Sequence, residues 1–212
     1  MPLRLLRPSI LALAALLSAG ATAPVRAEKS DRFKPLNVEA DLPGKIDLLN
    51  QFVVFNGNVV VTKGTMIIRA TRIEVRELDG YHSAIAFGSP GQHATFRQRR
   101  DSPDEYIAGD AERLEYDGKS DVIRFVTNAS VRRLRGSETS DEISGNLVTY
   151  DSGTEVFNVS GGSTPTATNP GGRVRAVLTP KEGSAAAAEA ARAASAVPTP
   201  SLRTAPTLGD GR

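Results

Sequence analysis

The stretch that decides the fold is Val53 to Glu77, VVFNGNVVVTKGTMIIRATRIEVRE, in which apolar side chains recur at every second position. The apolar set is Val53, Phe55, Val59 and Val61 before the turn at Lys63-Gly64, and Met66, Ile68 and Ala70 after it. A period of two is that of a half-buried β-strand and not of a helix. Successive side chains of a strand point to opposite faces, so the sequence predicts one apolar face that must be covered or filled.

The same pattern returns twice along the chain. YIAGDAERLEYD leads into 122–134, and 143–150 leads into 156–159. Turn signals with Gly or Asp separate these runs, such as Asp79-Gly80 and Asp117-Gly118. The sequence therefore predicts an all-β meander of short antiparallel strands, with further strands at 36–41, 46–54, 83–87, 94–97 and 173–178 and a turn at 88–91.

The two ends of the chain differ from this middle. Residues 1–27 carry Arg4 and Arg7, then an apolar run, then Val25-Arg26-Ala27, which predicts a Sec-type signal peptide cleaved after Ala27 and a periplasmic protein. A membrane anchor is the alternative, although the run is shorter than the about 20 residues that span a bilayer. We expect a domain over 28–180 and a disordered Ala/Pro-rich tail over 181–212, with at most a short alanine helix.

Composition narrows the function classes. The chain has no cysteine, so stability in an oxidising compartment must come from the sheet and from apolar burial. Removal of the three arginines of the leader leaves 23 basic against 24 acidic residues, a net charge of −1. Nucleic acid is therefore not an expected partner.

Residues for catalysis or metal binding are few. His82 and His93 stand beside turn residues without metal-ligand spacing, and we interpret them as turn or surface residues. The acidic group Asp101, Asp104, Glu105 and Asp110 could bind calcium in principle but lacks EF-hand spacing, which favours a solvated loop. The sequence predicts no enzyme activity, no metal site and no cofactor.

Two arginine clusters allow two interpretations. They are Arg97, Arg99 and Arg100, and Arg132, Arg133 and Arg135. The first interpretation, which we favour, is that they form the outward, charged face of strands. The second is that some line the rim of a groove and bind anionic sugar or phosphate groups.

With these features in view, the chain resembles the OstA-like family. The residues that carry the resemblance are FNGNVVVTKGT (55–65), Ile68-Arg69-Ala70, Gly88-Ser89-Pro90, Ala94-Thr95-Phe96, Gly109-Asp110-Ala111, Leu114-Glu115-Tyr116 and the strand LNVEAD (36–41). The sequence departs from the family at Thr71, where an acidic residue is usual, and at Thr127-Asn128-Ala129, where the family has a Gly-Asn-Ala turn.

The resemblance implies an open-ended β-jelly roll that binds lipopolysaccharide and carries it from the inner to the outer membrane, with the lipid A acyl chains in an apolar groove. It also implies LptC as partner at the amino-terminal edge (36–41), the LptD amino-terminal domain at the carboxy-terminal edge (148–159 or 173–178), and head-to-tail self-association. A long two-faced meander with few aromatic residues leaves room for a lipid in its interior.

We expect the groove to be lined by inward apolar side chains, each of which could equally pack the core. They are Leu36, Val38, Val53, Phe55, Val59, Val61, Ile68, Ile73, Phe96, Leu114, Tyr116, Phe125, Val131, Ile143, Val148, Tyr150 and Phe157. The competing hypotheses are an LptC-like subunit, an LptD fragment, and an exported β-solenoid with a dry core and a structural role.

Overall fold

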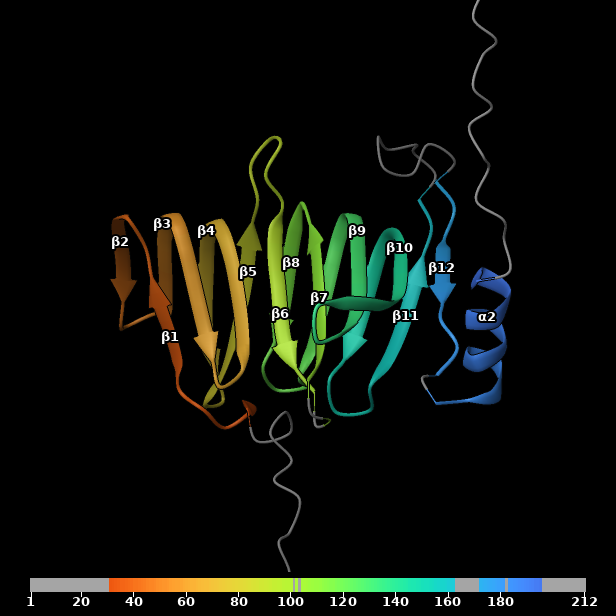
Figure 1. The fold of residues 1–212 in the computed structure, drawn as a ribbon. Helices are drawn as coiled ribbons and strands as arrows, with labels where there is room; N and C mark the ends of the chain where they lie inside the picture. The colour runs from red at the N-terminus through yellow and green to blue at the C-terminus, as the bar shows by residue number, and fades with distance from the viewer. Residues whose placement is uncertain (1–30, 101, 103, 163–171, 182, 196–212) are drawn as a thin grey trace, which may run out of the picture.

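The computed structural model describes residues 31–100, 102, 104–162, 172–181 and 183–195. The predicted signal peptide and residues 196–212 lie outside these ranges. In the described part, twelve strands form one continuous antiparallel sheet (Figure 1). The strands are β1 Leu36–Glu39, β2 Leu42–Asp47, β3 Phe52–Lys63, β4 Met66–Leu78, β5 Tyr81–Phe87, β6 Ala94–Arg99, β7 Glu105–Ala111, β8 Arg113–Asp117, β9 Val122–Arg135, β10 Glu138–Asp151, β11 Val156–Ser160 and β12 Arg175–Leu178.

Four long strands, β3, β4, β9 and β10, bend in the middle and build two layers. Their two halves pair with different neighbours: β3 with β2 and β1, β4 with β5 and β6, β9 with β8 and β7, and β10 with β11 and β12. Layer 1 contains β2, β5, β8, β11 and the halves 52–56, 72–78, 122–126 and 147–151. Layer 2 contains β1, β6, β7, β12 and the halves 59–63, 66–70, 129–135 and 138–145.

Two of the four bends, those of β3 and β9, use residues with positive φ. In β3 they are Gly57 (φ 76°) and Asn58 (φ 41°), and in β9 they are Thr127 (φ 66°) and Asn128 (φ 54°). Each asparagine side chain donates to a carboxylate at the entry to the neighbouring strand, Asn58 to Asp41 and Asn128 to Glu112, both at 2.6 Å. Thr127-Asn128 therefore makes the same bend as Gly57-Asn58, although threonine replaces glycine.

The all-β, open-ended jelly roll predicted from the sequence is confirmed. The strands stack from β2 and β1 at one end to β11 and β12 at the other without closing into a barrel (Figure 1). The predicted strands at 83–87, 94–97 and 173–178 and the turn at 88–91 are also present, with shifts of a few residues.

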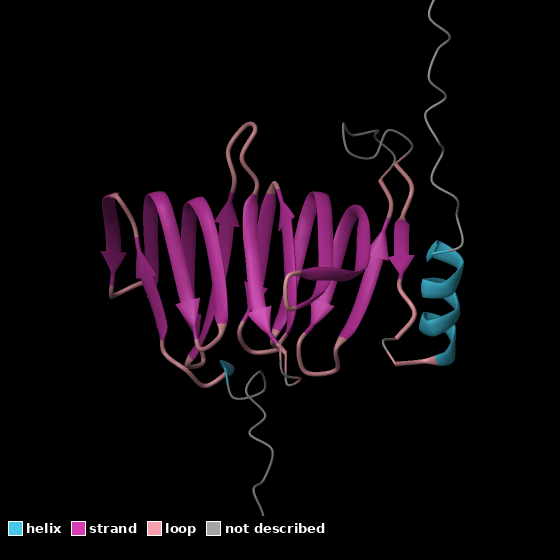
Figure 2. Cartoon of the chain, in the orientation of Figure 1, coloured by secondary structure: helices cyan, strands magenta, loops and turns pink. Residues whose placement is uncertain are grey.

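One prediction needs correction. The strand expected over 46–54 is two strands, because Asn50 donates to the Asp47 carboxylate from its backbone and side chain, both at 3.1 Å, and closes a turn. Within the tail, residues Ala185–Ser195 form helix α2, the short alanine helix that the sequence allowed there, and it lies outside the strand stack (Figure 2). Alanine has the highest helix propensity, and the Ser184 hydroxyl accepts from the Ala187 N–H at 3.2 Å as an N-cap.

Helix α2 has no buried residue, so the jelly roll does not depend on it for its core. Among the described residues, no helix combines the length and the apolarity needed to cross a bilayer.

Candidate functional site: the interior between the two layers

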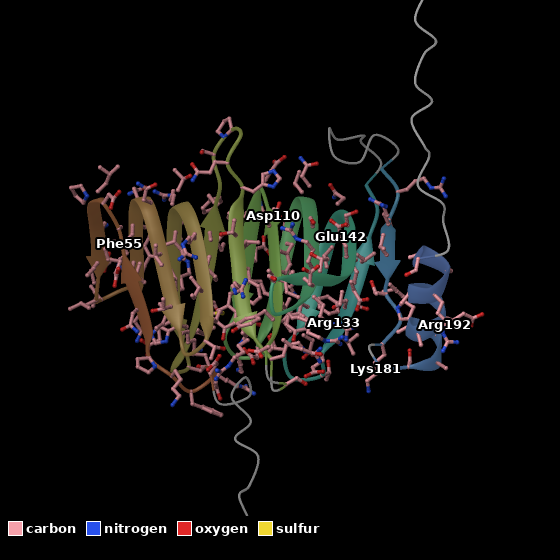
Figure 3. The ribbon with its side chains drawn as sticks, in the orientation of Figure 1. Phe55, Asp110, Arg133, Glu142, Lys181 and Arg192 are labelled. Carbon is pink, nitrogen blue, oxygen red and sulfur yellow. The ribbon has the colours of Figure 1, made fainter. Side chains whose placement is uncertain are left out.

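The inward faces of the two layers form a single apolar interior. Every side chain that the sequence analysis assigned to the groove lies in this cluster. Those that are only partly buried lie toward the two ends of the stack, Leu36, Val38, Val53 and Phe55 at the β1/β2 end and Ile143 and Phe157 at the β11/β12 end. Figure 3 shows Phe55 near the β2 end.

In the middle of the stack the two layers touch. Phe96 of layer 2 meets Phe125 of layer 1 edge to face, with ring centroids 5.7 Å apart, and Ile73 and Phe125 are both 0% exposed. A Cβ on Gly109 would lie 2.6 Å from the Phe125 ring, so the glycine makes room for that ring. The sequence analysis expected open space here because aromatic residues are few.

That expectation is wrong for the middle because small inward residues bring the layers together. Ala84, Ala86, Ala94, Ala111 and Ala129 are all buried on the inward face. Short side chains shorten the distance between two packed sheets, so fewer large side chains fill the space. A lipid in the middle of the interior must therefore part the layers.

The two ends are more open. At the β11/β12 end a cavity of about 340 Å³ lies against the apolar side chains Val131, Ile143, Tyr150, Phe157 and Leu178. The Tyr150 and Phe157 rings stack there at 4.5 Å between centroids. At the β1/β2 end the Phe55 ring covers Gly44, where a Cβ would lie 2.4 Å from the ring.

Opposite the bends, the strand ends and hairpin turns form a seam between the layers, and the buried polar residues gather along it. They are Asp31, Lys63, Gln98, Asp121 and Ser152. Asp31, from the segment before β1, accepts from the Thr65 N–H at 2.9 Å and from Gln98 Nε2 at 3.5 Å, and Ser152 Oγ donates to Gln98 Oε1 at 3.5 Å. These contacts join layer 2 to the β10–β11 turn of layer 1.

A second polar chain crosses the same seam. Lys63 Nζ donates to the Tyr116 hydroxyl at 3.1 Å, and this hydroxyl donates to Asp121 Oδ1 at 3.1 Å. Burial lowers the pKa of Lys63 and raises the pKa of Asp121. The attraction between the two charges acts in the opposite direction on each pKa but is the smaller effect. Burial and the nearby Asp121 raise the pKa of Tyr116.

Sequence analysis missed the seam contacts, although one signal was available. Lys63 shares the parity of Val59 and Val61, so a charged residue stood on the inward face of β3. An inward charge predicts a buried polar partner, but the partners Tyr116 and Asp121 are more than 50 residues away in the chain and become neighbours only through the fold.

The histidines are not joined into a metal centre. His93 Nδ1 lies 2.9 Å from Asp110 Oδ2, and Arg132 lies 3.2 Å from the other oxygen of that carboxylate. His82 lies 3.5 Å from Glu77. Among the described residues, which exclude Asp101, no group of three or more His, Asp or Glu side chains is arranged to hold a metal ion.

The architecture defines a class of protein: an open-ended jelly roll with an apolar interior and unpaired strand edges at both ends. Comparison with known proteins agrees with this class. The chain belongs to the LptA/(LptD N-terminal domain) LPS transport protein family, which matches residues 37–156, more than half of its length.

The individual relatives share less than a third of their residues with this chain. The chain is 28% identical over 184 residues to the lipopolysaccharide export system protein LptA of Haemophilus influenzae, covering 85% of this chain and 96% of that protein. It is 28% identical over 123 residues to LptA of Escherichia coli K12, covering 58% of this chain and 65% of that protein. The fold resembles the crystal structure of LptH, an LptA homologue of Pseudomonas aeruginosa, with a TM-score of 0.60, 21% identity and coverage of 71% and 99% of the two chains.

Proposed function

We propose that this chain is a periplasmic lipopolysaccharide-binding protein that carries the lipid between the inner and outer membranes, with the acyl chains held between its two layers. The observation that supports this most directly is the apolar interior, which runs without interruption from the β1/β2 end to the β11/β12 end. Family membership supplies the lipid class. In this account the lipid undergoes no chemical step.

The energetics favour such a carrier. Exposure of acyl chains to water costs about 0.8 kcal/mol per methylene, so a chain of ordinary length costs on the order of 10 kcal/mol. When the layers part, contacts such as Phe96–Phe125 are lost, but acyl chains rebury the same apolar surface. The total apolar surface that is removed from water therefore changes little when acyl chains replace the side-chain contacts.

Unpaired strand edges at both ends support assembly by strand addition. Within the described residues, β1 and β2 pair only with β3, and β11 and β12 pair only with β10. We place LptC at the β1/β2 edge, and the LptD amino-terminal domain or a second copy of this chain at the β11/β12 edge. Within the range 148–159, Val148 to Asp151 already pair on both sides, with β9 and β11. Among the described residues of that range, those of β11 can therefore add a strand.

Self-association has a simple test. A head-to-tail contact does not close, so the average mass in sedimentation should rise with concentration. A monomer at every concentration would refute self-association.

The test of lipid carriage is native mass spectrometry of protein purified from lipopolysaccharide-producing cells without detergent. We expect lipopolysaccharide to be retained. The touching middle of the interior favours one second candidate, an exported structural module with a dry core. That candidate predicts lipid-free protein in the same measurement.

A further inference from the structure

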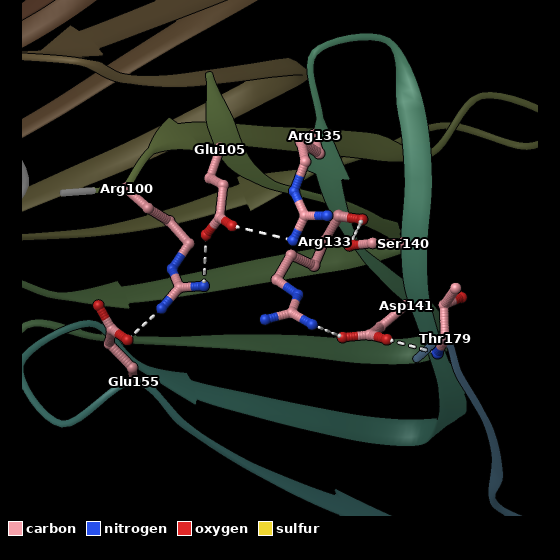
Figure 4. Close-up of polar contacts among 8 residues, drawn as sticks. All are labelled: Arg100, Glu105, Arg133, Arg135, Ser140, Asp141, Glu155 and Thr179. Carbon is pink, nitrogen blue, oxygen red and sulfur yellow. Dashed lines mark hydrogen bonds and ion pairs between the residues drawn. The ribbon is translucent and has the colours of Figure 1, made fainter. Parts of the chain in front are cut away.

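The cavity at the β11/β12 end is apolar on one side and charged on the other. Its apolar side includes Ile143 and Phe157, and its charged side consists of Arg100, Arg133, Asp141 and Glu155. Figure 4 shows these charged side chains, which come from the loop after β6, from β9, from β10 and from the β10–β11 turn. An apolar wall next to guanidinium groups is the chemistry that recognises an amphiphile with an anionic head.

The fold divides the two arginine clusters of the sequence by face. Phe96, Gln98 and Val131 are buried inward, so Arg97, Arg99 and Arg132 point outward, while Arg100 and Arg133 line the cavity. Two of the outward members have partners on the outer surface: the Arg97 guanidinium lies 4.0 Å from the Tyr106 ring centroid, and Arg132 pairs with Asp110.

The cavity arginines hold unused hydrogen-bond donors. Arg100 pairs with Glu105 at 3.1 Å and also with Glu155, and Arg133 pairs with Asp141 at 2.5 Å. The Nε atoms of both arginines are buried and have no hydrogen-bond partner, and the same is true of the outward Arg132, so what sets Arg100 and Arg133 apart is their place in the cavity. A buried donor without an acceptor costs free energy, which a ligand oxygen would recover.

The two cavity carboxylates, Asp141 and Glu155, differ in exposure and in the number of their hydrogen-bond partners. The Asp141 side chain is 15% exposed and its carboxylate also accepts from the Thr179 N–H at 2.9 Å. The Glu155 side chain is 36% exposed and sits in a turn with φ 59°. Glu155 is therefore the partner that a competing anion displaces at the lower cost.

We propose that this cavity is a subsite for the phosphate-bearing sugar at the base of the acyl chains, a step that rests on the proposed function. The phosphate takes the place of Glu155 on Arg100 and bridges to Arg133, while an acyl chain lies against Ile143 and Phe157. Guanidinium groups pair with phosphate through parallel hydrogen bonds, which makes arginine well suited to this role.

The test measures the affinity of the full mature chain for lipopolysaccharide, for the same lipid after enzymatic dephosphorylation, and for inorganic phosphate. The variant is Arg133→Gln. Its matched control is Arg132→Gln, the next residue of β9, which is also ion-paired but points outward. Loss of one charge-assisted hydrogen bond predicts about tenfold weaker binding of the phosphorylated lipid by Arg133→Gln and unchanged binding by Arg132→Gln.

The dephosphorylated lipid should bind wild type and Arg133→Gln equally. A second variant, Glu155→Gln, removes the competing carboxylate from an exposed turn and should bind the phosphorylated lipid severalfold more tightly than wild type. The two variants are thus expected to change affinity in opposite directions. A folding defect in Arg133→Gln could not explain tighter binding by Glu155→Gln.

Equal binding of both lipids by wild type would overturn the subsite and leave lipid carriage intact. Absence of binding to either lipid would instead refute the proposed function. Inorganic phosphate that binds as tightly as the lipid would also overturn the proposal, because the site would then recognise a free anion.

Discussion

At the scale of single residues, Thr127 shows how the fold tolerates an unfavourable backbone. A β-branched residue at φ 66° is strained, yet β9 bends there as β3 bends at Gly57. The surrounding pairing of β9 with β7 and β8 fixes the position of the bend on both sides.

Thr127→Gly should therefore stabilise the protein by about 1 kcal/mol, because relief of backbone strain exceeds the entropy cost of glycine. Chemical denaturation checks this value. The reciprocal change Gly57→Thr should destabilise, since a Cβ at Gly57 would lie 2.6 Å from Leu42 Cγ at φ 76°. An unchanged or lower unfolding free energy for Thr127→Gly would show that Thr127 carries no strain.

Asp121 makes the folding stability of the seam depend on pH. Burial raises the pKa of this carboxyl above its ordinary 3.8, so the folded protein keeps the proton to a higher pH than the unfolded chain does. The stability that this group contributes is complete below 3.8 and is lost as pH rises through the raised pKa.

The comparison with Asp121→Asn isolates this effect, because asparagine does not titrate. The unfolding free energy of wild type minus that of Asp121→Asn should be larger at pH 4 than at pH 8, because the protonated carboxyl stabilises the fold only at low pH. A difference that stays constant across this range, or that grows with pH, would contradict the assignment of a buried carboxylate.

At the scale of elements, the β3–β4 hairpin depends on a segment outside the sheet. The Asp31 carboxylate fills the space above Gly64, where a Cβ would lie 2.0 Å from Asp31 Oδ1, and it caps the Thr65 N–H. The segment that precedes β1 thus fastens the seam.

Asp31→Ala should lower the unfolding free energy by about 2 kcal/mol, because the half-buried Thr65 donor and the buried Gln98 donor lose their acceptor. Thermal unfolding monitored by circular dichroism measures the change. Lys34→Ala is the control, since Lys34 is exposed in the same segment. Equal midpoints for Asp31→Ala and wild type would exclude a structural role for this cap.

The strands could be predicted from sequence because two-residue periodicity is local. The parity of Val59, Ile68 and Phe125 was enough to assign each to the interior. Two features depended on the fold and escaped prediction. The separation of the layers is set by small residues that meet across the interior, such as Gly109 against Phe125, and the seam joins Lys63 to Tyr116 from distant strands.

At the scale of the whole molecule, the described strands form a two-layer roll that is bent on one side, held together by polar contacts on the other side and open at both ends. Apolar contacts close its middle, and a cavity remains at the β11/β12 end. In the function proposed above, a lipid would therefore have to part the layers, because these contacts close the middle of the interior.

The most direct measurement is photo-crosslinking in cells with a photoreactive amino acid placed on the inward or the outward face of each layer. Phe96 of β6 and Tyr116 of β8 are buried on the inward faces. Their outward counterparts are Arg97, the next residue of β6, and Arg124, an exposed residue of β9 opposite Glu115. The account predicts that lipopolysaccharide is captured from the two inward positions and not from the two outward ones. Equal capture from both faces, or capture from the outward positions alone, would contradict it.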